Sequence, residues 1–210
     1  MSSKDFSHVL VTGGAGFIGS HLVDRLVGAG CLVKVLDNLS TGKLENIRGH
    51  LDSGKAIFVE GDVRNASNVE RSVQDCDAVV HLAAQTSVPY SVENPWETFA
   101  INVGGTLNVL RSCAEGRQVG KLVFASSCAV YGDPVSLPAS EETSVGPISP
   151  YADSKLAAEK YCCGFSDVQI LPSVVLRFFN VYGPRQGLTE YAGVITRFIE
   201  QIRQGLPLVI

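Results

Sequence analysis

The sequence predicts a doubly wound α/β fold built on a parallel sheet, and two observations carry this prediction. Short apolar runs rich in valine recur along the chain, as expected for strands that are buried on both faces. Stretches with helical spacing of apolar residues separate these runs, and such alternation is typical of a parallel sheet with crossover helices. The six predicted strands are 8–12 (HVLVT), 32–37 (LVKVLD), 56–62 (AIFVEGD), 77–83 (DAVVHLA), 121–127 (KLVFASS) and 173–179 (SVVLRFF).

The clearest predicted helix spans 95–116. Asn94 is its predicted N-cap, Pro95 suits the first turn, and Glu97 completes a capping-box pattern. Apolar residues at helical spacing predict a buried stripe on one face of this helix. The stripe consists of Phe99, Val103, Leu107, Leu110 and Ala114.

Composition and charge exclude several classes of protein. Apolar residues make up 45% of the chain and charged residues 18%, which is typical of a globular protein. The net charge is −4 and no block of lysine or arginine occurs, so no nucleic-acid partner is expected. The polar N-terminus and the lack of a long apolar run predict a cytoplasmic protein with no membrane partner. Six cysteines without CxxC spacing predict reduced thiols, and four dispersed histidines predict no metal site.

Three glycines follow the first predicted strand in the segment GGAGFIGSHLVDRL. Gly13, Gly16 and Gly19 have GxxGxxG spacing, and an amphipathic helix follows them. They would permit, in that order, a tight turn, close approach of a pyrophosphate to the backbone, and close packing of helix on strand. The helix N-terminus would add amide donors and the positive end of the helix dipole. The pattern predicts a dinucleotide site of the Rossmann type.

The choice of cofactor depends on Asp37, the last residue of the second predicted strand. A carboxylate eighteen residues after Gly19 can accept hydrogen bonds from both hydroxyls of an adenine-side ribose and would repel a 2′-phosphate. No arginine follows in DNLSTGK, so the sequence favours NAD over NADP. The alternative is that Asp37 only caps the loop DNLS. Asp62, at the end of the third strand, is either an acceptor for the adenine amino group or a turn-forming aspartate.

The segment SPYADSKLAAEK carries a candidate acid/base pair. Ser149 is a predicted helix cap and Pro150 a first-turn residue, so the spacing places Tyr151 and Lys155 one turn apart on one helical face. An ammonium near a phenol favours the phenolate, and a nicotinamide cation would add to this shift. Tyr151 is therefore a candidate acid/base near neutral pH. Taken alone, YxxxK is equally compatible with an exposed pair on an ordinary helix.

Two serines end the fifth predicted strand, at the edge where a doubly wound sheet binds its ligands. A hydroxyl at this edge would donate to a substrate oxygen while the tyrosine exchanges a proton. Because side chains alternate along a strand, only one of Ser126 and Ser127 faces the cleft. The pattern alone does not select between them.

Five segments occur in a common order and spacing, and together they cover essentially the whole chain. They are TGGAGFIGSHL, HLAAQTSVPYS, SSCAVYG, SPYADSK and LRFFNVYGPRQ. In this they resemble the extended short-chain dehydrogenase/reductases, specifically the nucleotide-sugar 4-epimerases of the UDP-glucose 4-epimerase type. The resemblance implies NAD held in a Rossmann domain and a catalytic set of Ser127, Tyr151 and Lys155. The motif SSxxVYG selects Ser127 over Ser126.

The resemblance also implies sets of binding residues. The cofactor-binding set comprises Gly13, Gly16, Phe17, Ile18, Gly19, Asp37, Asn38, Asp62, Val63, Leu82, Ala83, Ala84, Asn102, Ser126, Tyr151 and Lys155. The substrate-binding set comprises Ser87, Ser127, Tyr151 and Asn180. For Asn102 and Asn180, a satisfied buried polar group is an alternative to a ligand contact.

The implied reaction inverts C4 of a UDP-hexose, either UDP-glucose and UDP-galactose or their N-acetyl forms. Tyr151 would remove the 4-hydroxyl proton as hydride passes to the nicotinamide, giving a 4-keto intermediate that rotates and takes hydride back on its other face. Lys155 would lower the tyrosine pKa and bind the nicotinamide ribose. Ser127 would hydrogen-bond the O4 region.

Departures from the family pattern bear on the reaction. Cys128 and Ala129 stand where the related 4,6-dehydratases carry an acidic pair that expels water, so dehydration is disfavoured. Tyr90 stands where family members frequently have an arginine, so the sequence does not identify the sugar of the substrate. Two alternatives remain: a non-catalytic NAD-binding module, and a nucleotide-sugar dehydratase or dehydrogenase of the same family.

The resemblance sets the expected domain organisation. A Rossmann domain is expected over 1–188, and 189–210 is expected to begin a C-terminally truncated substrate lobe. A helix is predicted at about 190–204, and LPLVI at 206–210 is predicted to open a buried strand. Because groups that position a substrate contribute much of an enzyme's power, reduced turnover is expected from the chain alone.

A homodimer is the expected assembly. Family members commonly pair through two helices, which correspond to 95–116 and 150–165 of this chain. Apolar candidates for the contact are Leu107, Leu110, Leu156 and Tyr161.

Overall fold

A computed structural model describes residues 6–116, 118–133, 137–187 and 194–208, which contain a sheet of six parallel strands. The strands are β1 (His8–Thr12), β2 (Leu32–Asp37), β3 (Ala56–Glu60), β4 (Ala78–His81), β5 (Lys121–Ser127) and β6 (Ser173–Phe178). Their order, β3-β2-β1-β4-β5-β6, reverses between β1 and β4, the switch point at which such folds bind ligands. The predicted fold class is confirmed, although β3, β4 and β6 are shorter than predicted.

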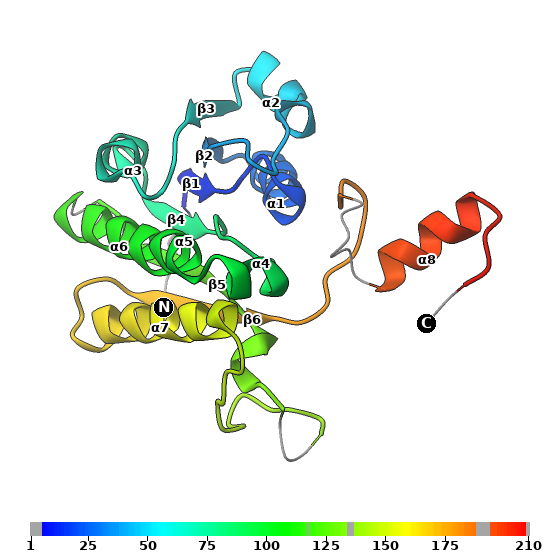
Figure 1. Ribbon diagram of the computed structural model, residues 1–210. Helices are drawn as coiled ribbons and strands as arrows, with labels where there is room; N and C mark the ends of the chain where they lie inside the picture. The colour runs from blue at the N-terminus through cyan, green and yellow to red at the C-terminus, as the bar shows by residue number, and fades with distance from the viewer. Residues whose placement is uncertain (1–5, 117, 134–136, 188–193, 209–210) are drawn as a thin grey trace.

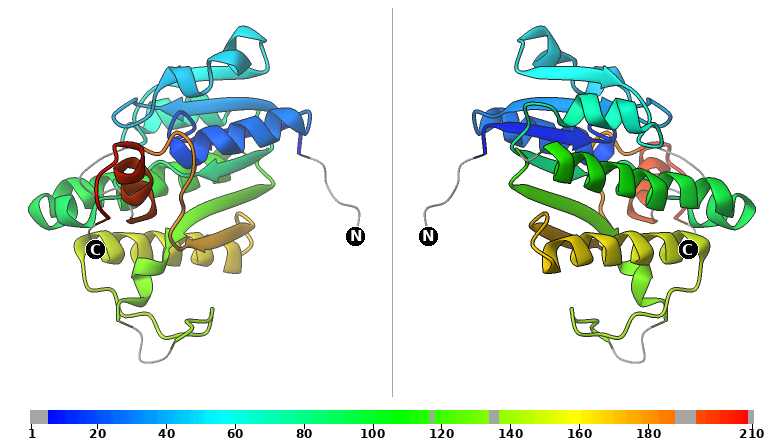
Figure 2. Two further views of the ribbon diagram at one scale, coloured as in Figure 1. Left: turned by 90° about the vertical axis from the view of Figure 1, so that its right-hand side faces the viewer. Right: turned by 90° about the vertical axis from the view of Figure 1, so that its left-hand side faces the viewer.

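Helices cover both faces of this sheet (Figure 1). They are α1 (Phe17–Gly28), α2 (Arg48–Asp52), α3 (Ala66–Val73), α4 (Val88–Glu93), α5 (Pro95–Phe99), α6 (Gly105–Gly116), α7 (Pro150–Asp167) and α8 (Val194–Arg203), with 3-10 turns at Leu44–Asn46 and Cys128–Tyr131. Figure 2 shows α1 over one face and α3, α6 and α7 over the other.

Each face of the sheet has its own hydrophobic core, because successive strand side chains point to opposite faces. In β1, Leu10 belongs to the core under α3, α6 and α7, whereas Val9 and Val11 belong to the core under α1. The alternation continues into β6, where Val175 packs on the first core but Val174 and Leu176 remain exposed. This double burial explains the continuous apolar character of β1.

The predicted helix 95–116 contains a π-helical turn at Ala100–Gly104, between α5 and α6. Such a turn inserts an extra residue and changes which side chains face the core. Val103 and Leu110 of the predicted stripe are buried, but Phe99 is 55% exposed, so that part of the stripe is wrong. Leu107 and Ala114 are half-buried.

The capping box predicted at the start of this helix is not formed. Asn94 makes no side-chain cap bond to α5. Glu97 instead accepts hydrogen bonds from the Tyr90 hydroxyl and from the Arg64 guanidinium. The helix therefore begins where Pro95 predicts, while its acidic residue joins the loop after β3 to α4.

One predicted subunit contact is wrong. Leu110 is fully buried in the core between α6 and its neighbours, so it cannot contribute to an interface. Leu107 and Leu156 are half-buried, and Tyr161 is 47% exposed.

The last described elements fit the predictions only in part. α8 lies within the predicted helix 190–204, and residues 190–193 lie outside the described part of the chain. Leu206–Leu208 are not in a strand, and residues 209–210 again lie outside it. α8 stands apart from both helical layers, as Figure 1 shows. None of the helices in the described ranges is long and apolar enough to cross a membrane.

Candidate active site

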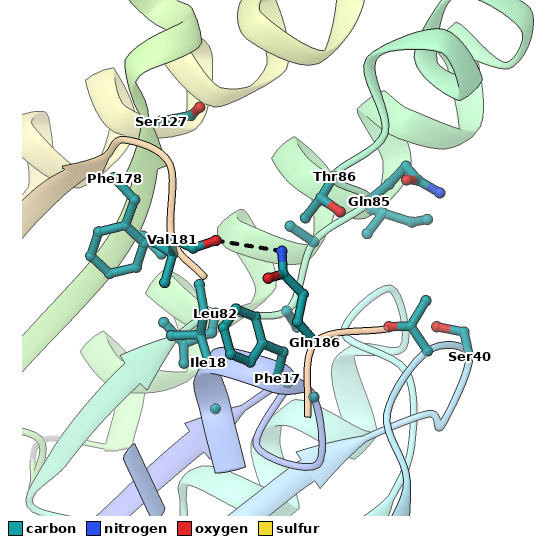
Figure 3. A pocket seen from close by; sticks show the side chains of 18 of the residues that line it. Phe17, Ile18, Ser40, Leu82, Gln85, Thr86, Ser127, Phe178, Val181 and Gln186 are labelled. Carbon is teal, nitrogen blue, oxygen red and sulfur yellow. Dashed lines mark hydrogen bonds between the residues drawn. The ribbon is translucent and has the colours of Figure 1, made fainter. Parts of the chain in front are cut away.

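A cavity of about 650 Å³ opens at the carboxyl ends of the strands. This volume lies within the usual range for ligand and cofactor sites. Phe17 and Ile18 of α1 line one side, and Phe178 and Val181 line the other (Figure 3). Of the residues predicted to bind cofactor or substrate, all line the cavity except Ser87 and Asn102.

The glycine loop has the shape that a dinucleotide requires. Gly13 adopts a φ of +70°, which favours glycine, and a Cβ there would lie 2.9 Å from the Ala83 nitrogen. A Cβ on Gly19 would lie 2.1 Å from the Gly13 oxygen, so only glycine lets α1 start this close to β1. The first amides of α1 have no acceptor within the helix. This cradle of donors fits the pyrophosphate of NAD.

Asp37 both caps its loop and faces the cavity. Its Oδ1 accepts a hydrogen bond from the Leu39 amide at 2.9 Å, and its Oδ2 accepts one from the Ala15 amide at 3.0 Å. Asp37 therefore does cap its loop, as one of its two interpretations predicted. Each carboxylate oxygen keeps a second lone pair, and Asp37 lines the cavity, so the residue also fits a ribose acceptor.

Asp62 is a turn-forming aspartate, which was one of its two predicted roles. Its Oδ1 accepts a hydrogen bond from the Arg64 amide at 2.8 Å, and the Arg64 guanidinium contacts both carboxylate oxygens. Asn38 Nδ2 donates to Oδ2 at 2.9 Å. The hydrogen bond from the Arg64 side chain, more than any other contact, lowers the pKa of Asp62 to about 2. The carboxylate is thus ionised and fixed at the edge of the cavity.

Asn102 lies behind the cavity wall. Its Oδ1 accepts from the Gln85 amide at 2.8 Å, and its Nδ2 donates to the Gln85 oxygen and to Ser154 Oγ, each at 2.9 Å. These contacts match the alternative of a satisfied buried polar group that ties the loop after β4 to α7. Ser87 caps α4 by accepting a hydrogen bond from the Tyr90 amide at 3.2 Å.

The two serines at the end of β5 have different surroundings. Ser126 is buried, and its Oγ donates to Glu159 Oε2 at 2.9 Å. Ser127 lies on the opposite side of the strand, where it lines the cavity and accepts a hydrogen bond from the Ala129 amide at 3.2 Å. Both serines line the cavity, but only the Ser126 hydroxyl is held by Glu159, so Ser127 stays the predicted substrate contact.

Tyr151 and Lys155 lie on one face of α7, as their spacing predicts, and both are buried at the cavity. Ser149 caps this helix by accepting a hydrogen bond from the Ala152 amide at 3.2 Å. Lys155 Nζ donates to the Ala125 oxygen at 2.8 Å and lies 5.0 Å from the centroid of the Phe124 ring. Burial lowers the pKa of Lys155 to about 8, so the ammonium still predominates at neutral pH.

The phenol of Tyr151 differs from the prediction. Burial raises the pKa of Tyr151, whereas a side-chain hydrogen bond with Ser127 lowers it and the charge of Cys128 raises it, and the pKa ends above its ordinary value. In the cofactor-free protein, Lys155 therefore does not lower the pKa of Tyr151 as the sequence predicted. The site brings together a phenol, a hydroxyl and a buried ammonium at the end of β5.

Several polar residues of the cavity were not predicted. Gln85, Thr86 and Gln186 line it, and Figure 3 shows them around the same space. Each lies within a segment that carried the resemblance, HLAAQTSVPYS or LRFFNVYGPRQ. Their position in those segments was the available signal.

The sequence matches the NAD dependent epimerase/dehydratase family over residues 9–210. A relative from Methanocaldococcus jannaschii, named as a putative UDP-glucose 4-epimerase, is 44% identical over 92% of this chain and 62% of its own. A solved UDP-N-acetylglucosamine 4-epimerase from Methanobrevibacter ruminantium, in complex with UDP-N-acetylmuramic acid, has a TM-score of 0.91 at 40% identity, over 99% of this chain and 66% of its own. The Thermus thermophilus UDP-glucose 4-epimerase in complex with NAD has a TM-score of 0.86 at 46% identity, over 95% and 64%.

The chain spans less than two thirds of the length of the curated relatives it matches. Within that span, the family match covers nearly every residue, and the glycine loop and the strand-end cavity lie where a Rossmann fold holds its cofactor. The chain belongs to the NAD dependent epimerase/dehydratase family.

Proposed function

We propose that this chain carries the NAD-binding and catalytic part of a 4-epimerase that acts on UDP-hexoses. The observation that carries the proposal is the meeting of Ser127, Tyr151 and Lys155 with the glycine loop in one cavity. The names of similar proteins, which include UDP-glucose and UDP-N-acetylglucosamine 4-epimerases, support this substrate class.

In the proposed mechanism, Tyr151 takes the proton of the sugar 4-hydroxyl and later returns it. Burial disfavours the phenolate, so a nearby positive charge is needed to form it. The Lys155 ammonium, fixed by the Ala125 carbonyl, would supply part of that charge in the cofactor-bound protein. NAD, when bound, would supply the hydride acceptor and donor, together with a second positive charge.

Ser127 has a distinct part in this mechanism. Its hydroxyl lowers the pKa of Tyr151, although burial outweighs this effect. A sugar O4 bound between the two side chains would accept a hydrogen bond from the Ser127 hydroxyl while the 4-hydroxyl proton moves to the Tyr151 phenolate. Ser127 would thus orient the reacting oxygen and stabilise charge on it.

The residues after Ser127 favour epimerisation over dehydration. Cys128 and Ala129 open the 3-10 turn Cys128–Tyr131. Neither is a carboxylic acid that could protonate a leaving hydroxyl. The chain therefore has the groups for proton exchange at O4 without an acid at these two positions.

The proposal is tested by incubating the protein with NAD and either UDP-galactose or UDP-N-acetylgalactosamine. We expect the C4 epimer to form without accumulation of NADH, and Y151F to abolish its formation. NAD binding without any epimer would contradict the proposal and favour a non-catalytic module. Stoichiometric accumulation of NADH would favour a dehydrogenase.

A further inference from the structure

The chain after β6 crosses the mouth of the cavity and is fastened to α1. We call residues 181–187 the strap. The Pro184 carbonyl accepts a hydrogen bond from His21 Nε2 at 2.9 Å, and Arg185 pairs with Asp24 Oδ2 at 2.9 Å. His21 and Asp24 both belong to α1, the helix whose first turn lines the cavity. The strap therefore joins the two sides of the cavity.

Asp24 is held ready for Arg185 by a second helix. Its Oδ1 accepts a hydrogen bond from His50 Nε2 of α2 at 2.6 Å. Burial opposes the charge of Asp24, but the hydrogen bonds from His50 and Arg185 outweigh it and lower the pKa of this carboxyl. About a third of each side chain of the Asp24–Arg185 pair is exposed, so the pair is partly shielded from solvent.

The strap is also closed upon itself. Gln186 Nε2 donates to the Val181 oxygen at 3.4 Å, a contact drawn in Figure 3, and Gln186 Oε1 accepts from Thr196 of α8 at 2.5 Å. Within the described residues, the polar contacts from the strap to earlier elements of the chain are those with His21 and Asp24. Loosening these contacts would free the strap as a unit.

We propose that Asp24 and Arg185 are positioning residues that latch the strap across the bound dinucleotide and slow its dissociation. Val181, Tyr182 and Gln186 of the strap line the same cavity as the glycine loop. A dinucleotide held by the first turn of α1 is therefore enclosed by the strap. In the proposed latch, release of the dinucleotide requires the strap and α1 to separate, and the Asp24–Arg185 pair bridges these two walls.

The latch rests on the proposed function and deepens it. A 4-epimerase must keep its reduced cofactor until hydride returns to the sugar ketone, whereas a dehydrogenase must release it in every cycle. A strap that retains NADH therefore favours epimerisation over net oxidation. Loss of the latch is expected to let NADH escape during turnover.

The test measures NADH release without any sugar. The chain is loaded with NADH and mixed with excess NAD, and the decay of bound NADH fluorescence gives the dissociation rate. R185Q and D24N are expected to release NADH about tenfold faster, because each removes a charge-assisted pair. R48Q is the matched control, since it breaks an arginine–glutamate pair that lies at the surface. Equal rates for D24N, R185Q and R48Q would overturn the latch.

Further variants separate the latch from a general loss of structure. R185K keeps the charge and is expected to release NADH at an intermediate rate. The charge exchange D24R/R185D is expected to restore slow release in part. H50Q leaves Arg185 in place and is expected to have a smaller effect. The melting temperature of each cofactor-free variant is measured as well. If the release rate of NADH rises only in proportion to the loss of melting temperature, the latch is overturned.

The outcomes also separate this proposal from the proposed function. Equilibrium binding of NADH to the unmodified chain is measured first. Failure to bind would overturn both the cofactor site and the latch. If NADH binds tightly but its release rate is unchanged in D24N and R185Q, the latch is overturned and the cofactor site is not.

Discussion

Lys155 Nζ donates to the carbonyl oxygen of Ala125 at 2.8 Å, which fixes a buried ammonium beneath the end of β5. Burial lowers the pKa of Lys155 from 10.5 to about 8. Because the unfolded chain binds this proton more tightly, the buried lysine destabilises the fold at every pH below about 8. K155M is therefore expected to raise the free energy of unfolding at neutral pH by about 2 kcal/mol. The same variant should lose at least about 100-fold in turnover.

Urea denaturation of K155M at several pH values checks this prediction. The gain should shrink as pH rises above about 8, since Lys155 becomes neutral in the folded chain. K160M is the control, because Lys160 lies exposed on the same helix. A K155M protein less stable than K160M at neutral pH would contradict the prediction.

His81 is a buried histidine whose hydrogen bonds define its tautomer. Thr106 donates its hydroxyl proton to the main-chain oxygen of Asn102 at 2.6 Å. The Thr106 hydroxyl oxygen can therefore only accept a hydrogen bond from His81 Nε2. Nδ1 then accepts from Thr12, 2.6 Å away. The ring is neutral, and burial, followed by the charge of Lys155, lowers the pKa of His81 to about 3.

This buried imidazole predicts an acid-sensitive fold. The unfolded chain gains a proton on His81 below its ordinary pKa of 6.5, while the folded chain does not until about 3, so stability falls with pH in this window. Between about pH 7.5 and pH 5 the loss is about 2 kcal/mol. H81Q should remove this slope from urea titrations, whereas H8Q, at an exposed histidine, should keep it. Parallel pH profiles for H81Q and the unmodified chain would refute the assignment.

Two glycines of α1 offer a matched pair of variants. A Cβ on Gly19 would lie 2.1 Å from the Gly13 oxygen, whereas a Cβ on Gly28 would meet nothing within 4 Å. G19A must therefore displace the glycine loop and is expected to weaken NAD binding about 100-fold or more. G28A should bind NAD normally and gain up to about 1 kcal/mol of stability, since alanine is the better helix former. Calorimetric titration with NAD measures both; equal affinities would show that the loop does not hold the cofactor.

Local patterns predicted the fold because its signals are local. The apolar run of β1 serves two cores, with Leu10 in one and Val11 in the other, and the turn at Gly13 needs glycine. Parallel sheets of this kind bind ligands at the carboxyl ends of their strands, and most of the predicted site residues line one cavity there.

The misses depend on contacts between distant parts of the chain. Asn102 faces inward in a π-helical turn because it bonds Gln85 and Ser154, the latter 52 positions away. Glu97 leaves its predicted capping role for Arg64, which lies 33 positions earlier in the chain. No short-range spacing encodes such partners. The same holds for the phenol of Tyr151, whose pKa is set first by burial.

The ion pair of Glu159, which is buried, and Arg177, which is half-buried, supports the end of β5 that carries Ser127. Arg177 binds both carboxylate oxygens of Glu159, and Ser126 donates to the same carboxylate at 2.9 Å. The guanidinium also lies 4.8 Å from the Tyr131 ring centroid. The three elements that meet here, α7, β5 and β6, carry Tyr151, Ser127 and the strap's origin.

E159Q is expected to lower the free energy of unfolding by about 3 kcal/mol, because it leaves the Arg177 guanidinium without a carboxylate. S126A removes only a neutral donor and should cost about 1 kcal/mol. E142Q, at an exposed glutamate, is the control and should be nearly neutral. Urea denaturation at low and high salt decides the origin of the effect: a surface pair weakens as ions screen it, whereas the shielded Glu159–Arg177 pair should keep its contribution. If the cost of E159Q disappears in high salt, the pair is solvated and does not brace the site.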